Sequence, residues 1–138
     1  MGNLSLNLLT AMLSGLSVLS FQAALAQQPK AWQAPASVQE IKNPFRNDPN
    51  AALEGKKIYI SVCAICHGDK GKGNGAASVA LTPHPANFLS IEVANESDGS
   101  IFWKMTEGRS PMAAYKTLLT DQQRWQLVTY IRKLEEKK

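Results

Sequence analysis

The sequence is short of the features that identify several common protein classes. Only two cysteines occur among its 138 residues, which excludes a scaffold with several disulfides. Basic residues are scattered and form no run with interleaved aromatics, so nothing suggests nucleic-acid binding. The composition, 19% charged and 44% hydrophobic, excludes global disorder and fits one ordinary domain. The net charge of +4 fits a surface that docks on an acidic partner, and it fits equally many proteins without a charged partner.

Charge is absent from the first 26 residues, which contain no Asp, Glu, Lys or Arg. This segment is rich in Leu and ends in Ala24-Leu25-Ala26, which fits the small-x-small rule of signal peptidase with cleavage before Gln27. An uncleaved anchor is the alternative, because the usual basic start is missing, but interspersed Ser, Asn and Gln weaken a stable span. We predict a signal peptide over 1–26, with an anchor in second place, and an exported, periplasmic protein.

Residues 27–49 hold four of the seven prolines. Proline removes backbone donors and fixes φ, so long regular elements are not expected there. The segment is either a tether or an arm that lies over the domain, with Trp32 and Phe45 pinned to its surface. The main domain is then expected over residues 50–138.

Strand patterns are also missing, whereas three segments combine a capping residue with an apolar stripe at helical spacing. The predicted helices run from Pro49 to Val62 behind Asp48, from Ser97 or Asp98 to a C-cap at Gly108, and from Thr120, whose capping box is completed by Gln123, to the last residues of the chain. Gly55 inside the first helix indicates that another backbone passes close by. The fold class predicted from these patterns is all-α.

Both cysteines and one of the two histidines lie within five consecutive positions, Cys63-Ala64-Ile65-Cys66-His67. On a helix, positions i, i+3 and i+4 share a face, so Cys63, Cys66 and His67 point the same way. That arrangement lets two thiols add to the two vinyl groups of a haem while the imidazole binds the iron. The motif is the signature of c-type haem attachment.

The cysteine pair has two other interpretations besides haem attachment. A CxxC disulfide is chemically possible after export, but it leaves His67 without a role. A zinc site would need four ligands, and Cys63, Cys66, His67 and His84 are four. However, Cys66 and His67 are neighbours, and neighbours rarely both reach one tetrahedral ion. Haem is therefore the preferred interpretation.

With these residues identified, positions 50–138 resemble a class I c-type cytochrome. Gly55 and Tyr59 stand eight and four positions before Cys63, where that family has a glycine and an aromatic, and Leu127 and Tyr130 resemble its last-helix contacts. The resemblance implies a cytochrome c fold, in which three to five helices pack around one covalently bound haem c. It also implies that the first and last helices cross at the glycine.

The resemblance further implies a methionine ligand in a loop between two helices, and Met112 is the residue so placed. Met105 lies within a predicted helix and suits core packing, while His84 and an open sixth position are the remaining alternatives. In the family, a carbonyl of a proline-rich loop accepts a hydrogen bond from the proximal imidazole. Pro83 is the expected acceptor, with Pro85 next.

The sequence offers no Ser-His-Asp set, phosphate loop or carboxylate pair, so we expect an electron carrier rather than an enzyme. The partners would be a redox donor and acceptor with an acidic docking surface, with membrane association through the N-terminal segment. The alternatives are a haem c subunit of a larger respiratory or oxidoreductase complex and, less favoured, an open-iron sensor or peroxidase-like protein. Because haem would form much of the core of so small a domain, the haem-free chain is expected to be largely unfolded.

Overall fold

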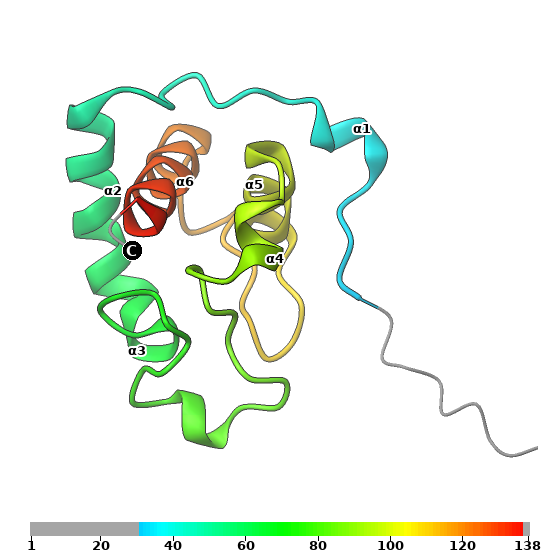
Figure 1. Cartoon of the computed structure of the whole chain (residues 1–138), viewed down its shortest axis with the longest axis vertical. Coiled ribbons are helices and arrows are strands. Elements are labelled where there is room, and N and C mark those ends of the chain that lie inside the picture. Colours follow the sequence, from blue (N-terminus) through cyan, green and yellow to red (C-terminus); the bar gives the residue numbers. More distant parts are fainter. Residues whose placement is uncertain (1–30, 137–138) are drawn as a thin grey trace, which may run out of the picture. The chain divides into compact units, whose positions relative to one another are not determined.

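The computed structural model describes residues 31–136, and from Gln33 onward these form one compact unit. Its elements are α1 (Ala36–Gln39), α2 (Pro49–Val62), α3 (Ala64–His67), the 3₁₀ turn η1 (Ser78–Ala80), α4 (Ile91–Ala94), α5 (Asp98–Glu107) and α6 (Asp121–Glu135) (Figure 1). The described residues contain no strand, and an isolated antiparallel pairing joins Arg109 and Met112. The prediction of an all-α fold is confirmed.

The three long helices begin where their capping residues predict. The Asp48 carboxylate accepts hydrogen bonds from the amides of Asn50 (2.8 Å) and Ala51 (3.2 Å), so α2 starts at Pro49. Ser97 caps α5, and Thr120 and Gln123 form the predicted reciprocal capping box of α6. The sequence therefore located these helices because each start is encoded by side chains next to it.

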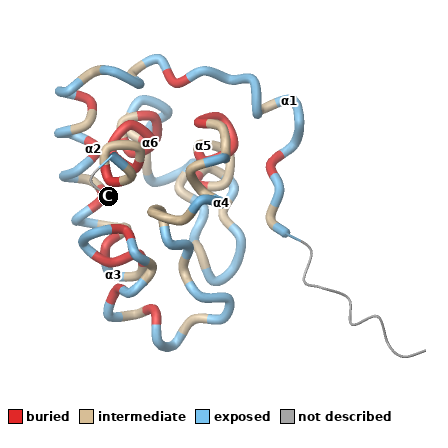
Figure 2. Tube along the Cα trace, viewed as in Figure 1, coloured by how far each residue is buried: buried red, intermediate tan, exposed pale blue. Residues whose placement is uncertain are grey.

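Helix α6 forms the centre of the core and packs against both α2 and α5. Buried positions are concentrated along it, and Leu127, Val128 and Thr129 are fully buried (Figure 2). Where α2 and α6 meet, a Cβ placed on Gly55 would lie 2.0 Å from the carbonyl oxygen of Gln126. The close backbone approach predicted from Gly55 is thus confirmed.

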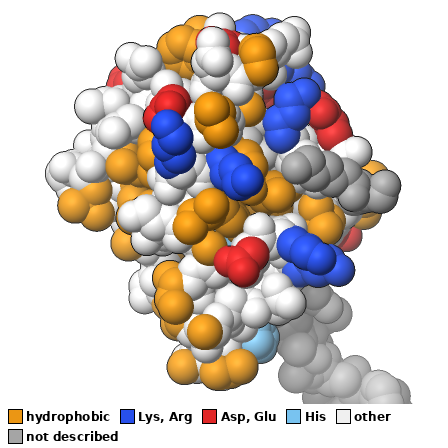
Figure 3. All heavy atoms as spheres, turned by 90° about the vertical axis from the view of Figure 1, so that its left-hand side faces the viewer, with side chains coloured by type: hydrophobic (Ala, Val, Ile, Leu, Met, Phe, Trp, Pro, Cys, Tyr) orange, Lys and Arg blue, Asp and Glu red, His pale blue; other side chains and the backbone are white. Residues whose placement is uncertain are grey.

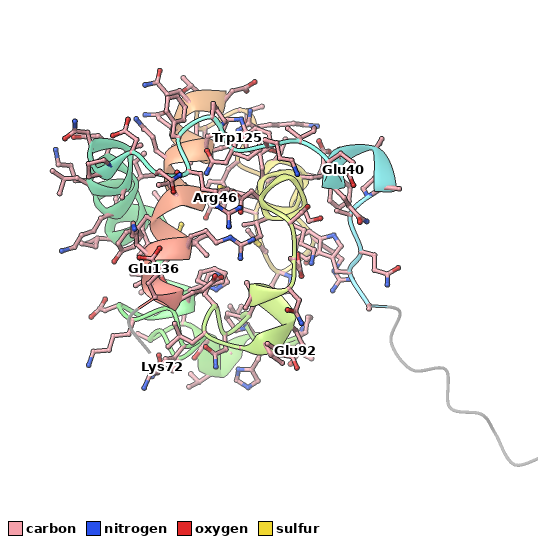
Figure 4. The ribbon with its side chains drawn as sticks, turned by 45° about the horizontal axis from the view of Figure 1, so that its top comes forward. Glu40, Arg46, Lys72, Glu92, Trp125 and Glu136 are labelled. Carbon is pink, nitrogen blue, oxygen red and sulfur yellow. The ribbon has the colours of Figure 1, made fainter. Side chains whose placement is uncertain are left out.

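The segment before α2 lies along α5 and α6. The Asn43 side chain is buried and donates to the Thr129 hydroxyl (2.9 Å), which in turn donates to the carbonyl of Phe45 (3.1 Å). Arg46 pairs with Asp98 at the start of α5 (3.3 Å), and Figure 4 labels Arg46 between α5 and α6. These contacts hold residues 43–46 on the domain. The role of residues 27–49 as a tether or an arm, and the domain boundary at residue 50, stay predictions.

The predicted signal segment, residues 1–26, lies outside the residues that the structure describes. Within residues 31–136, no helix combines the length and the apolar character needed to cross a bilayer. The leader and the export that it implies therefore stay predictions.

Candidate functional site

The Cys63–His67 segment forms one helical turn that continues from the end of α2. Cys63 is the C-cap residue of α2 and the N-cap residue of α3. Its carbonyl accepts hydrogen bonds from the amides of Cys66 (3.1 Å) and His67 (2.9 Å). The two cysteines are partly buried and are not joined to each other. Both sulfurs and the imidazole are therefore carried on a single rigid turn, as the motif predicts.

The His67 side chain is held on two sides. Its Nδ1 lies 3.0 Å from the carbonyl oxygen of Ala86, and its ring stacks on Phe88 with 4.4 Å between centroids and 14° between planes. A carbonyl can only accept, so Nδ1 carries the proton and donates it to this hydrogen bond. Burial lowers the pKa of His67 below its ordinary value, although the bond to Ala86 opposes this. A neutral ring with its Nε2 lone pair free is what metal ligation requires.

The acceptor for His67 is Ala86 rather than the predicted Pro83, which corrects that assignment. The reason is how two loops pair. The amide of Phe88 donates to the carbonyl of Gly71 (2.7 Å), and a Cβ on Gly73 would lie 2.4 Å from the carbonyl oxygen of Pro85. This contact brings residues 85–88 against the imidazole and leaves Pro83 exposed.

The cysteine environment bears on the two alternatives to haem. Burial, and secondarily the neighbouring Cys66, raise the pKa of the Cys63 thiol to about 12. A thiol with such a pKa is protonated near neutral pH and is a poor redox nucleophile. In the described part of the chain, no three His, Cys, Asp or Glu side chains are grouped so that they could hold a metal ion. The zinc alternative therefore has no support, and His84 is exposed.

The loop that carries Met112 is tied to the same end of α2. The Tyr115 hydroxyl donates to the carbonyl of Val62 (3.2 Å), next to Cys63, and the Tyr115 amide donates to the carbonyl of Met105 (3.0 Å). Met112 is partly buried against the core, whereas Met105 is 4% exposed and belongs to the core itself. Of Met105 and Met112, it is Met112 that lies in a loop that reaches the cysteine turn. Its ligation stays a prediction.

Two contributors to the site were missed from the sequence. The Ala86 carbonyl is a backbone group, so no side-chain pattern marks it. Tyr59 stands where the resemblance places an aromatic, but its hydrogen bond is visible only in the structure, where its buried hydroxyl donates to the Gly68 carbonyl (2.6 Å). Burial, with smaller contributions from Cys63 and other groups, raises the pKa of Tyr59 well above its ordinary value. Tyr59 thus fixes the chain directly after His67.

An all-α fold with a CxxCH turn directly after its first long helix defines a c-type cytochrome domain. Residues 50–131 match a protein family described as cytochrome c oxidase, cbb3-type, subunit III. The match spans more than half of the chain, and the chain belongs to this family. The family and the motif together indicate haem c as the cofactor.

A solved structure from Kuenenia stuttgartiensis, described as the reducing HAO-like protein complex Kustc0457/Kustc0458, is similar to this chain. The TM-score is 0.59 at 26% sequence identity, over 68% of this chain and 49% of that one. The chain thus spans about half the length of this relative. No curated protein matches the sequence.

The residues at the turn fit haem c. Cys63 and Cys66 are unpaired thiols on one face of a turn. His67 presents a neutral ring whose Nδ1 is hydrogen-bonded to the Ala86 carbonyl, so Nε2 is the nitrogen left for a metal. Such a hydrogen bond on the far nitrogen orients a metal-binding imidazole and raises its basicity. Cys63 and Cys66 are therefore the residues that would hold the porphyrin, and His67 the residue that would bind its iron.

Proposed function

We propose that this protein is a class I, monohaem c-type cytochrome that transfers single electrons. The observation that carries the proposal is the Cys63–His67 turn, with His67 bonded to Ala86 and stacked on Phe88. When bound, the haem supplies reversible one-electron oxidation and reduction of its iron. The sequence holds one CxxCH motif, which supports one haem per chain.

We propose Met112 as the sixth ligand. The support is its place in a loop anchored by Tyr115 beside Cys63, while Met105 is taken up by the core. The chain's own contribution is to hold these groups still. The Ala86 carbonyl and the Phe88 ring fix the imidazole, and the Tyr115 bond fixes the methionine loop. A ligand set that does not move during oxidation keeps reorganisation small, which suits a carrier that turns over no substrate.

The carrier would be exported to the periplasm, either free or tethered through residues 1–49. A second candidate is a haem c subunit of a larger complex. The family match favours it, and so does the Kuenenia structure, which is a complex of two named components. Purification distinguishes the two, because a subunit is isolated with stable companions. Mass spectrometry of the mature chain tests the leader, since cleavage predicts a chain that starts at Gln27.

Absorption spectroscopy of the purified protein and of Met112→Ala tests the proposal. We expect a haem that stays with the chain after denaturation and a weak ferric charge-transfer band, typical of a Met–iron bond, that Met112→Ala abolishes. Met105→Leu is the matched control and should keep the band. A colourless mature protein from cells competent in cytochrome maturation would refute the function. A band that persists in Met112→Ala would refute only the ligand, and carbon monoxide binding by the unmodified reduced protein would indicate an open iron.

A further inference from the structure

The glycine-rich loop that follows the Cys63–His67 turn folds back onto it. Alternate amides of the loop donate to three consecutive carbonyls of the turn: Gly73 to His67 (2.8 Å), Gly75 to Cys66 (3.0 Å) and Ala77 to Ile65 (2.9 Å). The last carbonyls of a helical turn have no partner within the helix, so these three bonds satisfy them. We call residues 73–77 the capping loop.

The capping loop approaches the turn so closely that position 75 has no room for a side chain. A Cβ placed on Gly75 would lie 2.3 Å from the carbonyl oxygen of Ile65 and 2.5 Å from that of Ala64. Any larger residue would push the loop away from the turn. The fold therefore requires glycine at this position, and the residue before it is Asn74.

The Asn74-Gly75 dipeptide carries a reaction of its own. Asparagine is chemically labile, and a following glycine leaves the backbone nitrogen unhindered. The Gly75 nitrogen, once its proton passes to solvent, can attack the side-chain carbonyl carbon of Asn74. The bond to the side-chain nitrogen then breaks and ammonia leaves. Water opens the resulting cyclic imide, and the products are aspartate and isoaspartate.

The surroundings of the dipeptide favour this reaction. Asn74 is exposed and, together with Gly75, lines a surface hollow of about 970 Å³, so water reaches the site. Lys70 and Lys72 line the same hollow, and positive groups stabilise the negative charge that develops during such an attack. Figure 3, which views the α2 side of the molecule, shows Lys and Arg side chains interleaved with hydrophobic ones. Any protection must therefore come from the backbone.

The folded backbone opposes the attack on both sides. The Gly75 amide is held by the Cys66 carbonyl, and the Gly75 carbonyl accepts a hydrogen bond from the Ser78 amide (2.9 Å). The Asn74 Oδ1 atom lies against Gly68, where a Cβ would be 2.3 Å away. The nitrogen can attack only after these contacts open, so the free energy of that opening slows the reaction.

We propose that Asn74-Gly75 is a deamidation site that the folded, haem-loaded protein protects and that reacts in chains without haem. The proposal rests on the proposed function, because the haem-free chain is expected to be largely unfolded. Isoaspartate at position 74 adds a carbon atom to the main chain, which shifts the register of the three bonds between loop and turn. A chain that deamidates before it receives haem therefore cannot form the same capping loop.

Peptide mapping by mass spectrometry, applied to the haem-loaded protein, tests the protection. The protein is incubated at mildly alkaline pH in buffer alone or in guanidinium chloride, where covalent haem stays attached. We expect deamidation at Asn74 to be at least about ten-fold slower in buffer, because the site must first open. Asn87 and Asn95, followed by Phe88 and Glu96, are internal controls and should react slowly in both. Asn74→Gln should stay unmodified in both, since glutamine would need a larger ring.

The role of the capping loop is measured in two ways. Hydrogen exchange of the Gly75 amide in the unmodified protein should be slow, because this amide is bonded to the turn. Gly73→Ala places a Cβ 2.4 Å from the carbonyl oxygen of Pro85 and should displace the loop. Deamidation of this variant in buffer should approach the rate in guanidinium chloride.

The link to haem is tested in cells. The double variant Cys63→Ser with Cys66→Ser cannot attach haem, and its chains should contain more isoaspartate at position 74 than the haem-loaded protein. Equal isoaspartate in the two would overturn that link. Equal rates in buffer and denaturant would overturn the protection, and no reaction in either would overturn the site. A colourless unmodified protein that still reacts faster in denaturant would count against the proposed function and its haem, while the protected site would stand.

Discussion

Substitution of Gly55 by alanine tests the helix crossing that carries the site. In an ordinary helix the change from Gly to Ala stabilises by about 1 kcal/mol, because alanine has the better helix propensity. At Gly55 the new Cβ would lie 2.0 Å from the carbonyl oxygen and 2.6 Å from the carbonyl carbon of Gln126, well inside the 3.4 Å at which ordinary contact begins. The steric effect and the propensity therefore act in opposite directions.

The steric effect should dominate because the atoms in the way are backbone. A flexible side chain could rotate aside, but the Gln126 carbonyl moves only if α6 separates from α2, and the Cβ of Tyr130 on the same helix adds a second close contact at 3.0 Å. Overpacking of this kind typically costs 1–3 kcal/mol. We expect a loss of about 2–3 kcal/mol, which for a domain of about 100 residues corresponds to a fall in Tm of about 10–20 °C.

Thermal unfolding of the haem-loaded protein, followed by far-UV circular dichroism, measures the effect. Lys56→Ala is the matched control, since it lies next to Gly55 on the exposed side of α2 and should change stability by less than about 0.5 kcal/mol. An unchanged or raised Tm in Gly55→Ala would refute the reasoning, because propensity alone would then account for the result.

Three other predictions follow from the same structure. Asp98→Ala should lower the free energy of unfolding by about 3 kcal/mol, because Asp98 is buried and pairs with the mostly buried Arg132 (2.8 Å). Arg46→Ala, at the exposed end of the same network, should lower it by less than about 1 kcal/mol. Urea unfolding midpoints at constant m-value compare the two variants, and equal losses of stability would contradict this account. Burial raises the pKa of Tyr59, so above pH 10 the unfolded state loses the phenol proton first and the free energy of unfolding falls by up to about 1.4 kcal/mol per pH unit. Tyr59→Phe should flatten this decline, which denaturation measured between pH 9 and 11 would detect. If the hydroxyl is solvated instead, the dependence of stability on pH should be the same in the variant and the unmodified protein. The chain made without haem should lack most of its helical circular dichroism, and a well-folded haem-free form would contradict the view that haem completes the core.

Sequence reasoning worked where the determinants are local. The starts of the long helices follow from Asp48, Ser97 and Thr120, because each cap bonds to amides two or three residues away. The shared face of the cysteine turn follows from helical spacing alone. Gly55 was informative for the same reason, since a glycine inside a helix has few explanations other than a close neighbour.

The predictions ended where tertiary contacts decide. The acceptor for His67 was placed three residues too early, because it is set by the pairing of Phe88 with Gly71 across two loops. The bond from Asn43 to Thr129 on α6 joins residues 86 positions apart and has no local signature. The four-residue helices α1 and α4 were also missed, because so short a turn carries no periodicity that could be recognised.

The attachment of residues 43–46 determines how the domain would respond to tension. A pull applied at Gln33 would reach the Asn43–Thr129 and Arg46–Asp98 contacts before it reached α2. Those contacts transfer the force to α5 and α6. The Cys63–His67 turn is therefore protected from strain applied on the chain's N-terminal side. A restraint applied at that end would therefore leave the geometry of the Cys63–His67 turn unchanged.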